Sequence, residues 1–405
     1  MTAVDELASG VEARVIAIRR DIHQNPELGN REFRTATLVA ERLRELGIET
    51  TTGVAHTGVV GLLRGAHPGR VVALRADMDA LPVREEVDVP FASKVKTTYD
   101  GNEVGVMHAC GHDAHVAVLL GVAEVLVKMR EQIHGSVKFI FQPAEEGAPM
   151  GEEGGAELMV KEGVLENPKV DAIFGLHVGS RVGLGQIGYK SGGAMAAVDT
   201  LRIVVRGKQT HGAYPWLGVD PIVVASQIIL GLQTIPSRQL DSSLAPSIVT
   251  IGIIRGGVRN NIIPDEVEMV GTLRSLDVQM RDVLHQRVRR TSEQIAASGG
   301  AKATVTITRG YPITYNDPEL TERMLPALRR VAGQHNVVQA GASLGAEDFA
   351  FYQQKVPGLF FWLGTSSKEA ANHSPRFSID ESALLLGVRA LANVALDFLN
   401  AGPSV

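Results

Sequence analysis

The chain has 405 residues, which is too long for one typical hydrophobic core and predicts two domains. Hydrophobic residues make up 44% and charged residues 21%, a balance that is typical of a folded globular protein and excludes extensive disorder. The formal net charge of −5 provides no broad basic surface, so nucleic acid is not an expected partner.

The chain contains one cysteine, Cys110, so it cannot form an intrachain disulfide, and it fits a reducing compartment. The first residues include the acidic pair Asp5 and Glu6 where a signal peptide would carry basic residues and then an apolar core. No apolar run approaches the ~20 residues that cross a bilayer. We therefore expect a cytoplasmic protein without a membrane partner.

The chain opens with two predicted helices, over residues 4–25 and 31–47, in which apolar residues recur at helical spacing. Pro26 and Gly29 separate them. His23 lies at the end of the first helix, and we interpret it as a structural residue.

Two short strands are predicted next, over residues 58–63 and 71–76. The second runs into Asp77 and Asp79, and side chains at alternate strand positions point the same way. The pair can therefore support a site at the strand end. The alternative is that both aspartates only cap the following loop.

Cys110 and His112 flank a glycine just before a predicted helix over residues 113–128. Thiolate and imidazole are ligands that zinc and similar ions accept, and the glycine allows a tight turn between them. The helix N-terminus also favours a thiolate. The alternative is an ordinary buried thiol beside a hydrogen-bonded histidine. His115, one turn into the helix, is interpreted as a packing residue.

Glu145 and Glu146 follow an apolar strand over residues 137–141. Neighbouring residues at a strand end point to opposite sides, so one carboxylate can bind a metal while the other accepts a proton. Hydrolysis needs this division, because a metal lowers the pKa of a bound water to ~7 and a nearby carboxylate removes the proton. The alternative is a solvated surface pair. His177 ends another buried strand, over residues 172–177, and is a further candidate ligand.

Between residues 188 and 310 the predicted elements follow the order β-α-β-β-α-β. This order is that of a ferredoxin-like domain, and metal-ligand residues resume only beyond it. It is therefore predicted to be a satellite domain inserted into the larger one. Its loops contain His211 beside a glycine, where packing gives no reason for a histidine, so we consider a functional role as well as a structural one.

The larger domain resumes with a helix over 320–332, a buried strand over 357–364 and a last helix over 382–399. His373 lies in the loop before that last helix, which lacks apolar periodicity, and it is the final candidate ligand. The predicted fold is thus α/β: a discontinuous mixed-sheet domain over 1–187 and 311–405, with helices on both faces, and a satellite over 188–310.

Five stretches together resemble the dinuclear metal-dependent amidohydrolase and aminoacylase family, in its branch of N-acyl-amino-acid, hippurate and auxin-conjugate hydrolases; they are residues 75–82, 108–115, 141–147, 345–349 and 372–375. The resemblance implies that Asp79 holds His112 in the tautomer that binds metal. It also implies that the satellite caps the active site and mediates a homodimer or homotetramer.

For the satellite, the resemblance implies that His211 polarises the substrate carbonyl or stabilises the oxyanion. Asn261 and Arg274 match family positions near the substrate, where Arg274 would bind a carboxylate. A surface ion pair is the alternative for Arg274. Trp216 stands where many relatives have a histidine, and Cys110 stands near the point where an aspartate bridges two metals in the wider family.

These residues predict a site with two divalent ions, chosen among zinc, manganese, cobalt and nickel, because five donors are too many for one tetrahedral ion and a water. The donors are Cys110, His112, Glu146, His177 and His373. Glu145 would be the base in the hydrolysis of an N-acyl amino acid to a carboxylic acid and an amino acid. The alternatives are a dipeptidase or carboxypeptidase with the same site, and a non-catalytic metal-binding protein, which would have no use for Glu145.

Overall fold

The computed structural model describes residues 3–366 and 371–401, and these form two compact units. The large unit comprises Met1–Gly192, Tyr315–Gly341 and Phe351–Val405. The small unit comprises Gly193–Thr314 and Ala342–Ala350. It therefore includes a short return segment, Ala342–Ala350, that lies outside the predicted range of 188–310.

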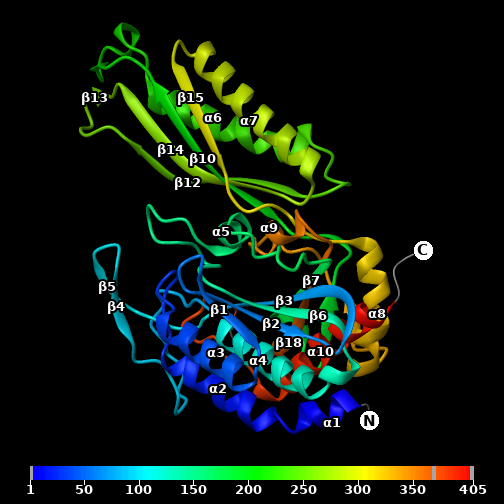
Figure 1. The fold of residues 1–405 in the computed structure, drawn as a ribbon. Coiled ribbons are helices and arrows are strands. Elements are labelled where there is room, and N and C mark those ends of the chain that lie inside the picture. Colours follow the sequence, from blue (N-terminus) through cyan, green and yellow to red (C-terminus); the bar gives the residue numbers. More distant parts are fainter. Residues whose placement is uncertain (1–2, 367–370, 402–405) are drawn as a thin grey trace. The chain divides into compact units, whose positions relative to one another are not determined.

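The large unit is built on a mixed eight-stranded sheet (Figure 1). In spatial order the strands are β1 (Glu49–Val54), β2 (Gly58–Arg64), β6 (His134–Gln142), β3 (His67–Asp77), β7 (Ala172–Gly183), β18 (Gly358–Ser366), β8 (Ile187–Tyr189) and β17 (Val337–Gln339). The four strands β6, β3, β7 and β18 are parallel to one another, whereas β2 and β8 on either side of them are antiparallel. Their carboxyl ends therefore meet at one edge, where ligands gather in sheets of this kind.

Helices cover both faces of this sheet. Helices α4 (His112–Lys128) and α10 (Leu384–Asn400) pack against β3, β6 and β7, and they are covered in turn by α2 (Glu12–Gln24) and α8 (Pro318–Ala332). A Cβ atom at Gly61 would meet α3 (Phe33–Glu45), whereas one at Gly58 would meet α5 (Gly155–Lys161). Positions three apart in a strand face opposite ways, so α3 and α5 lie on opposite faces.

Helix α10 is the apolar centre of the packed layer. The segment Glu381–Asn400 is long and apolar enough to cross a membrane, so the expectation that no apolar run approaches this length was wrong. However, 72% of its apolar stretch is buried inside the structure. Burial of this extent is what a core helix shows, because its apolar surface is already covered by protein.

The first predicted helix is interrupted in the structure. Instead of one helix over 4–25 there are two, α1 (Ala3–Ser9) and α2, with Gly10 and Val11 between them. Glycine has a low helix propensity, which accounts for a break at this point. A hairpin that the sequence analysis did not predict, β4 (Lys96–Tyr99) and β5 (Asn102–Gly105), forms a two-stranded sheet of its own.

The small unit has the predicted β-α-β-β-α-β order. Its elements are β10 (Ala197–Arg206), α6 (Pro221–Thr234), β12 (Ser247–Gly256), β14 (Glu266–Ser275), α7 (Val278–Ser298) and β15 (Lys302–Arg309). The sheet order β12-β14-β10-β15, antiparallel throughout, is the ferredoxin-like one. Both helices begin at an aspartate whose side chain accepts backbone N–H bonds, Asp220 and Asp277. The predicted α/β fold class is confirmed.

Candidate metal site

The large unit brings six predicted site residues to one edge of its sheet. His177 lies in β7, and Glu145 and Glu146 follow the carboxyl end of β6. Cys110 and His112 lie at the N-terminus of α4, and His373 lies in the loop before α10. Parallel strands whose carboxyl ends meet here explain why residues so far apart in the chain converge.

The turn that carries the thiol depends on Gly111. This glycine has φ of 91°, in the left-handed region, and a Cβ atom on it would lie 2.3 Å from a methyl group of Val178. Any other residue would be strained at this φ and would force the side chain of Val178 to move. The turn places the Cys110 Sγ atom 3.4 Å from Nε2 of His177. The loop of His373 is fixed beside it by a backbone bond from His373 N to Ala109 O at 2.8 Å.

Two groups of potential ligands overlap at Cys110. In the first, one atom each of Cys110, His112 and His177 lies within 4.8 Å of the others. In the second, the same is true of Cys110, Glu146 and His373. Two groups that share one thiol suit a pair of ions joined by a bridging ligand, because each ion then has three protein donors.

The charges around the thiol support the same interpretation. Burial favours the neutral thiol, but the charge of His177 and the hydrogen bonds from His112 and His177 together lower the pKa of Cys110 to about 6. Hydrogen bonds to Cys110 and Glu146 raise the pKa of His373 to about 10, and its Nε2 lies 3.1 Å from Oε1 of Glu146. A thiolate and a carboxylate that hold a neighbouring imidazole in its charged form also attract a divalent cation.

Asp79 connects two of the candidate ligands. Its Oδ1 atom lies 3.2 Å from Nδ1 of His112, and its Oδ2 accepts a hydrogen bond from Glu146 N at 2.9 Å. The Nε2 atom of His112 is buried, and besides the adjacent Cys110 it has no hydrogen-bond partner within residues 3–366 and 371–401. A histidine bound to a carboxylate at Nδ1 and open at Nε2 is the arrangement that metal-binding histidines adopt. The donor set therefore fits the implied ions.

His115 and Asp77 form a buried support that the sequence analysis did not assign. His115 donates from Nδ1 to Oδ1 of Asp77 at 2.5 Å, and its Nε2 accepts the N–H of Val178 at 2.9 Å. Burial lowers the pKa of His115, consistent with a neutral ring that both donates and accepts. The contact holds the backbone next to His177. In the sequence, the one indication of this contact was that Asp77 and Asp79 occupy alternate positions at the end of a strand.

Glu32 supports the loop that carries the two glutamates. It accepts a hydrogen bond from Ala144 N at 2.9 Å, and Ala144 has φ of 52°. A Cβ atom at Gly29 would lie 2.8 Å from Gly147 O, so this segment packs closely on the same loop. Burial and the charge of Asp79 raise the pKa of Glu32 to about 8. No periodicity links residues 32 and 144, so sequence patterns did not reveal this contact.

The remaining predicted residues belong to the small unit. His211 is exposed, and its Nδ1 accepts the N–H of Ala213 at 3.0 Å. Asn261 lies beside it, since its carbonyl accepts the N–H of Gly212 at 2.8 Å. Arg274 donates to the carbonyl of Leu344 at 2.7 Å. Their roles toward a substrate stay predictions.

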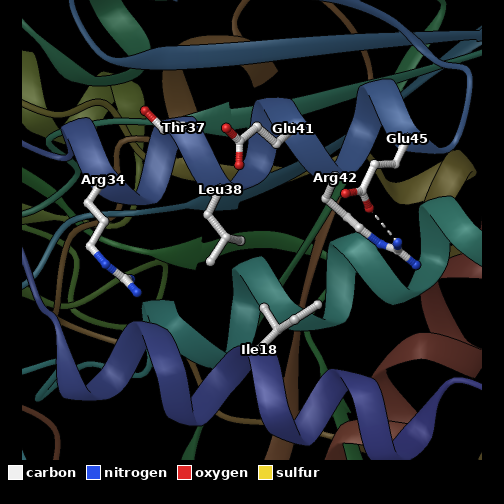
Figure 2. Close-up of a pocket in the computed structure, with 7 residues that line it drawn as sticks. All are labelled: Ile18, Arg34, Thr37, Leu38, Glu41, Arg42 and Glu45. Carbon is white, nitrogen blue, oxygen red and sulfur yellow. Dashed lines mark hydrogen bonds and ion pairs between the residues drawn. The ribbon is translucent and has the colours of Figure 1, made fainter.

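Of two cavities in the large unit, one is lined in part by candidate site residues and the other is not. A cavity of about 680 Å³ is lined in part by Asp79 and Glu146. Another, of about 460 Å³, lies between α2 and α3 and is lined by none of the candidate site residues (Figure 2). Its Arg42 is paired with Glu45 at 2.8 Å. The first hollow is therefore the one that is continuous with the candidate metal site.

Comparison with known proteins gives one consistent family. The family model for peptidase family M20/M25/M40 matches residues 73–397. Thermostable carboxypeptidase 2 of Saccharolobus solfataricus is 45% identical over 99% of this chain and 100% of its own. N-acetylcysteine deacetylase of Bacillus subtilis is 41% identical over 95% of this chain and 96% of its own.

A solved structure agrees with these sequence matches. The Bacillus subtilis YXEP protein, described as a dinuclear metal binding peptidase from the M20 family, is 38% identical to the chain. The match has a TM-score of 0.82 and covers 96% of this chain and 99% of that one.

Proposed function

The chain belongs to peptidase family M20/M25/M40, and on that premise we propose that it hydrolyses N-acyl amino acids to a carboxylic acid and a free amino acid. The predicted resemblance to the metal-dependent amidohydrolases is confirmed, and the chain is a hydrolase of amide or peptide bonds. The observation that carries the proposal of metal-dependent hydrolysis is the pair of ligand groups sharing Cys110, with Glu145 beside them. The similarity to N-acetylcysteine deacetylase supports an N-acyl amino acid as the substrate.

Two divalent ions would be held by Cys110, His112 and His177 on one side and by Cys110, Glu146 and His373 on the other. When bound, such ions polarise an amide carbonyl and lower the pKa of water. The chemistry of the donors allows zinc, manganese, cobalt or nickel, because thiolate and imidazole suit zinc, cobalt and nickel and the carboxylate of Glu146 suits manganese.

Glu145 is the base in this proposal. Its side chain is buried, and its Oε2 atom lies 3.9 Å from Nε2 of His112. Glu145 stands outside the two groups that share Cys110, but it forms a further group with His112 and Glu146 whose ligand atoms lie within 4.8 Å of one another. In this proposal it acts as the base and not as a ligand. It removes a proton from the attacking water and returns that proton to the nitrogen of the departing amine.

The small unit supplies the other substrate contacts in this proposal. His211 stabilises the oxyanion that forms from the amide carbonyl. Asn261 hydrogen-bonds the substrate, and Arg274 pairs with the carboxylate of the amino-acid product. The exposure of His211 supports a contact with a ligand, because the ring is not enclosed by its own unit.

Carboxypeptidase activity is the second candidate. The similarity to thermostable carboxypeptidase 2 at 45% identity favours it over a dipeptidase. Both activities cleave an amide next to a free carboxylate, so the same base and ligands serve either. They differ in whether the group on the other side of the bond is a simple acyl chain or a blocked peptide.

We further propose that the chain acts in the cytoplasm as a homodimer or homotetramer assembled through the small unit. Its single cysteine suits a reducing compartment. Strand β12 lies at the edge of the small sheet, and its apolar residues Ile253 and Ile254 are 42% and 51% exposed. An exposed apolar edge strand favours pairing with another chain.

The test is an activity panel on protein reconstituted separately with zinc, manganese, cobalt and nickel. N-acetyl and N-benzoyl amino acids are compared with blocked peptides and free dipeptides at equal concentration. Chelator-sensitive release of amino acid from the N-acyl compounds, at higher kcat/KM than from the peptides, supports the proposal. Faster cleavage of blocked peptides would instead assign carboxypeptidase activity, and no hydrolysis with any ion would contradict both.

A further inference from the structure

The partly buried Asn372 lies beside the thiol that the two ligand groups share. Its Nδ2 atom is 3.4 Å from Sγ of Cys110 and 3.4 Å from the carbonyl oxygen of the same residue. Sulfur is a larger atom than oxygen, so this distance is ordinary for a hydrogen bond to the thiol and long for one to the carbonyl. Both atoms are acceptors, so the amide turns its NH2 group toward them and not its oxygen.

Two neighbouring segments hold this amide in place. The loop of Asn372 is tied to the turn of the thiol by the bond from His373 N to Ala109 O at 2.8 Å. On another side the amide faces β7, where a Cβ atom at Gly179 would lie 3.3 Å from Oδ1 of Asn372. The amide therefore lies between the turn that carries the thiol and the strand that carries His177.

The other side chains that bond this sulfur are themselves candidate ligands. Nε2 of His177 lies 3.4 Å from Sγ, and His112 and His373 also hydrogen-bond the thiol. In the proposed site these three imidazoles bind the ions. An imidazole nitrogen that binds an ion carries no proton, so it cannot donate to the sulfur. The neutral amide nitrogen of Asn372 keeps its protons and remains a donor.

A hydrogen bond to a metal-binding thiolate has two effects. It withdraws electron density from the sulfur, and it thereby changes how strongly the sulfur donates to a metal. It also restricts the direction in which the sulfur points, because the donor is held by its own surroundings. Both effects reach the ions through the thiol, so such a donor needs no contact with the substrate.

We propose that Asn372 is a positioning residue of the metal site, which donates a hydrogen bond to Sγ of Cys110 and holds the sulfur between the two ligand groups. This inference rests on the proposed function, because it needs the metal ions of that proposal. The sequence analysis used residues 372–375 for the family resemblance and assigned a role to His373 alone. The contact with the thiol gives Asn372 a role of its own.

Two substitutions remove the donor in different ways. Asn372→Leu keeps nearly the size and branching of the side chain, and Asn372→Ala removes the amide without adding bulk, in case the leucine variant does not fold. Asn336→Leu is the matched control, because Asn336 also donates from Nδ2, here to Ala332 O at 2.8 Å at the end of α8. Circular dichroism and thermal unfolding establish that each variant is folded.

The first readout is the absorption spectrum of each protein loaded with cobalt(II), in which a thiolate ligand gives a sulfur-to-cobalt charge-transfer band. Loss of the N–H donor leaves more electron density on the sulfur, so the transition needs less energy. Asn372→Leu and Asn372→Ala should therefore shift the band to longer wavelength, and Asn336→Leu should leave it unchanged. An unshifted band in the folded Asn372 variants would overturn the assignment.

The second readout is metal affinity, measured by competition with a chromogenic chelator. Loss of a side chain that orients a metal ligand typically costs about 10- to 100-fold in affinity, so Asn372→Leu should bind cobalt and zinc at least about tenfold more weakly. Asn336→Leu should bind them like the unchanged protein. Equal affinities of Asn372→Leu and the unchanged protein would show that the sulfur is held without the amide, which also contradicts the assignment.

These readouts separate the inference from the proposed function. If N-acyl amino acids are hydrolysed but the band does not move in the Asn372 variants, the inference fails while the function stands. If the band shifts and the affinity falls but no N-acyl amino acid is hydrolysed with any ion, the proposed function fails instead. If the unchanged protein shows no sulfur-to-cobalt band, Cys110 is not a ligand, and both the metal site and this inference fail.

Discussion

The Oδ1 atom of Asp79 lies 3.2 Å from Nδ1 of His112, at the inner end of the candidate metal site. Both side chains are buried, so water does not compete strongly for this contact. The second oxygen of Asp79 accepts the N–H of Glu146. Asp79 thus fixes the orientation of His112 and the loop that carries Glu146. These two residues come one from each of the two ligand groups that share Cys110.

Asp79→Asn should weaken metal binding without removing a ligand. The amide is neutral and no longer stabilises the N–H of His112, and replacing such outer partners typically costs about 10- to 100-fold in metal affinity. Competition with a chromogenic chelator measures the affinity directly. Asp100→Asn is the control, because Asp100 is exposed and lies in the hairpin turn. Equal affinities for Asp79→Asn and the unchanged protein would contradict the assigned orientation role.

Glu145→Gln should retain its metal ions and lose several orders of magnitude in kcat. The amide keeps the size of the side chain but cannot take a proton from water. Metal content by elemental analysis, measured together with kcat, separates loss of the base from loss of the ions. A variant that keeps more than about a tenth of the activity would remove Glu145 from the role of base.

Much of the site could be predicted because its residues follow apolar strands. Glu146 follows the buried strand β6, as predicted, whereas the strand predicted to end at His177 continues to Gly183, so His177 lies within β7; the carboxyl ends of parallel strands still meet at one edge. The contact of Glu32 with Ala144 could not be found in this way, since it joins a helix cap to a distant loop with no repeating pattern.

The β4–β5 hairpin was missed for a different reason. Its residues are largely exposed, so the strands lack the alternation of buried and exposed side chains that reveals a strand. The break at Gly10 was missed because apolar spacing continues from one helix to the next. Hydrophobic periodicity predicts elements that have a buried face. It cannot predict a segment that is exposed or that has no repeating pattern.

Asp199→Asn should destabilise the small unit. Asp199 is 2% exposed and accepts hydrogen bonds from Nε of Arg281 at 2.9 Å and from Gly310 N at 3.1 Å. Removing the charge leaves Arg281 buried without its counter-ion, a change that usually costs about 3–5 kcal/mol. Urea unfolding measures the free energy of unfolding.

Asp282→Asn is the matched control for this change. Asp282 pairs with Arg309, but the two side chains are 50% and 57% exposed. An exposed ion pair contributes about 0–1 kcal/mol, so the control should remain close to the unchanged protein. Equal effects of the two substitutions would show that the Asp199 cluster does not stabilise the small unit.

Glu32→Gln should make stability less dependent on pH between about 5 and 8. Burial and the charge of Asp79 raise the pKa of Glu32 from 4.5 to about 8 in the folded protein. The folded state therefore binds a proton that the unfolded state releases above pH 4.5. The stabilisation from this proton is complete below the unfolded pKa and is lost as pH rises through about 8.

Glutamine keeps an acceptor for Ala144 N and a donor for Thr57, but it does not ionise. The melting temperature of the Glu32→Gln variant, relative to that of the unchanged protein, should therefore rise as pH increases from 5 to 9. The measurement is thermal unfolding of the metal-free protein, because bound cations would change the field of Asp79. Glu49→Gln is the control, since Glu49 is exposed in β1 and should show no such trend. A difference in melting temperature that stays constant across this range would mean that Glu32 is ionised in the folded protein at neutral pH.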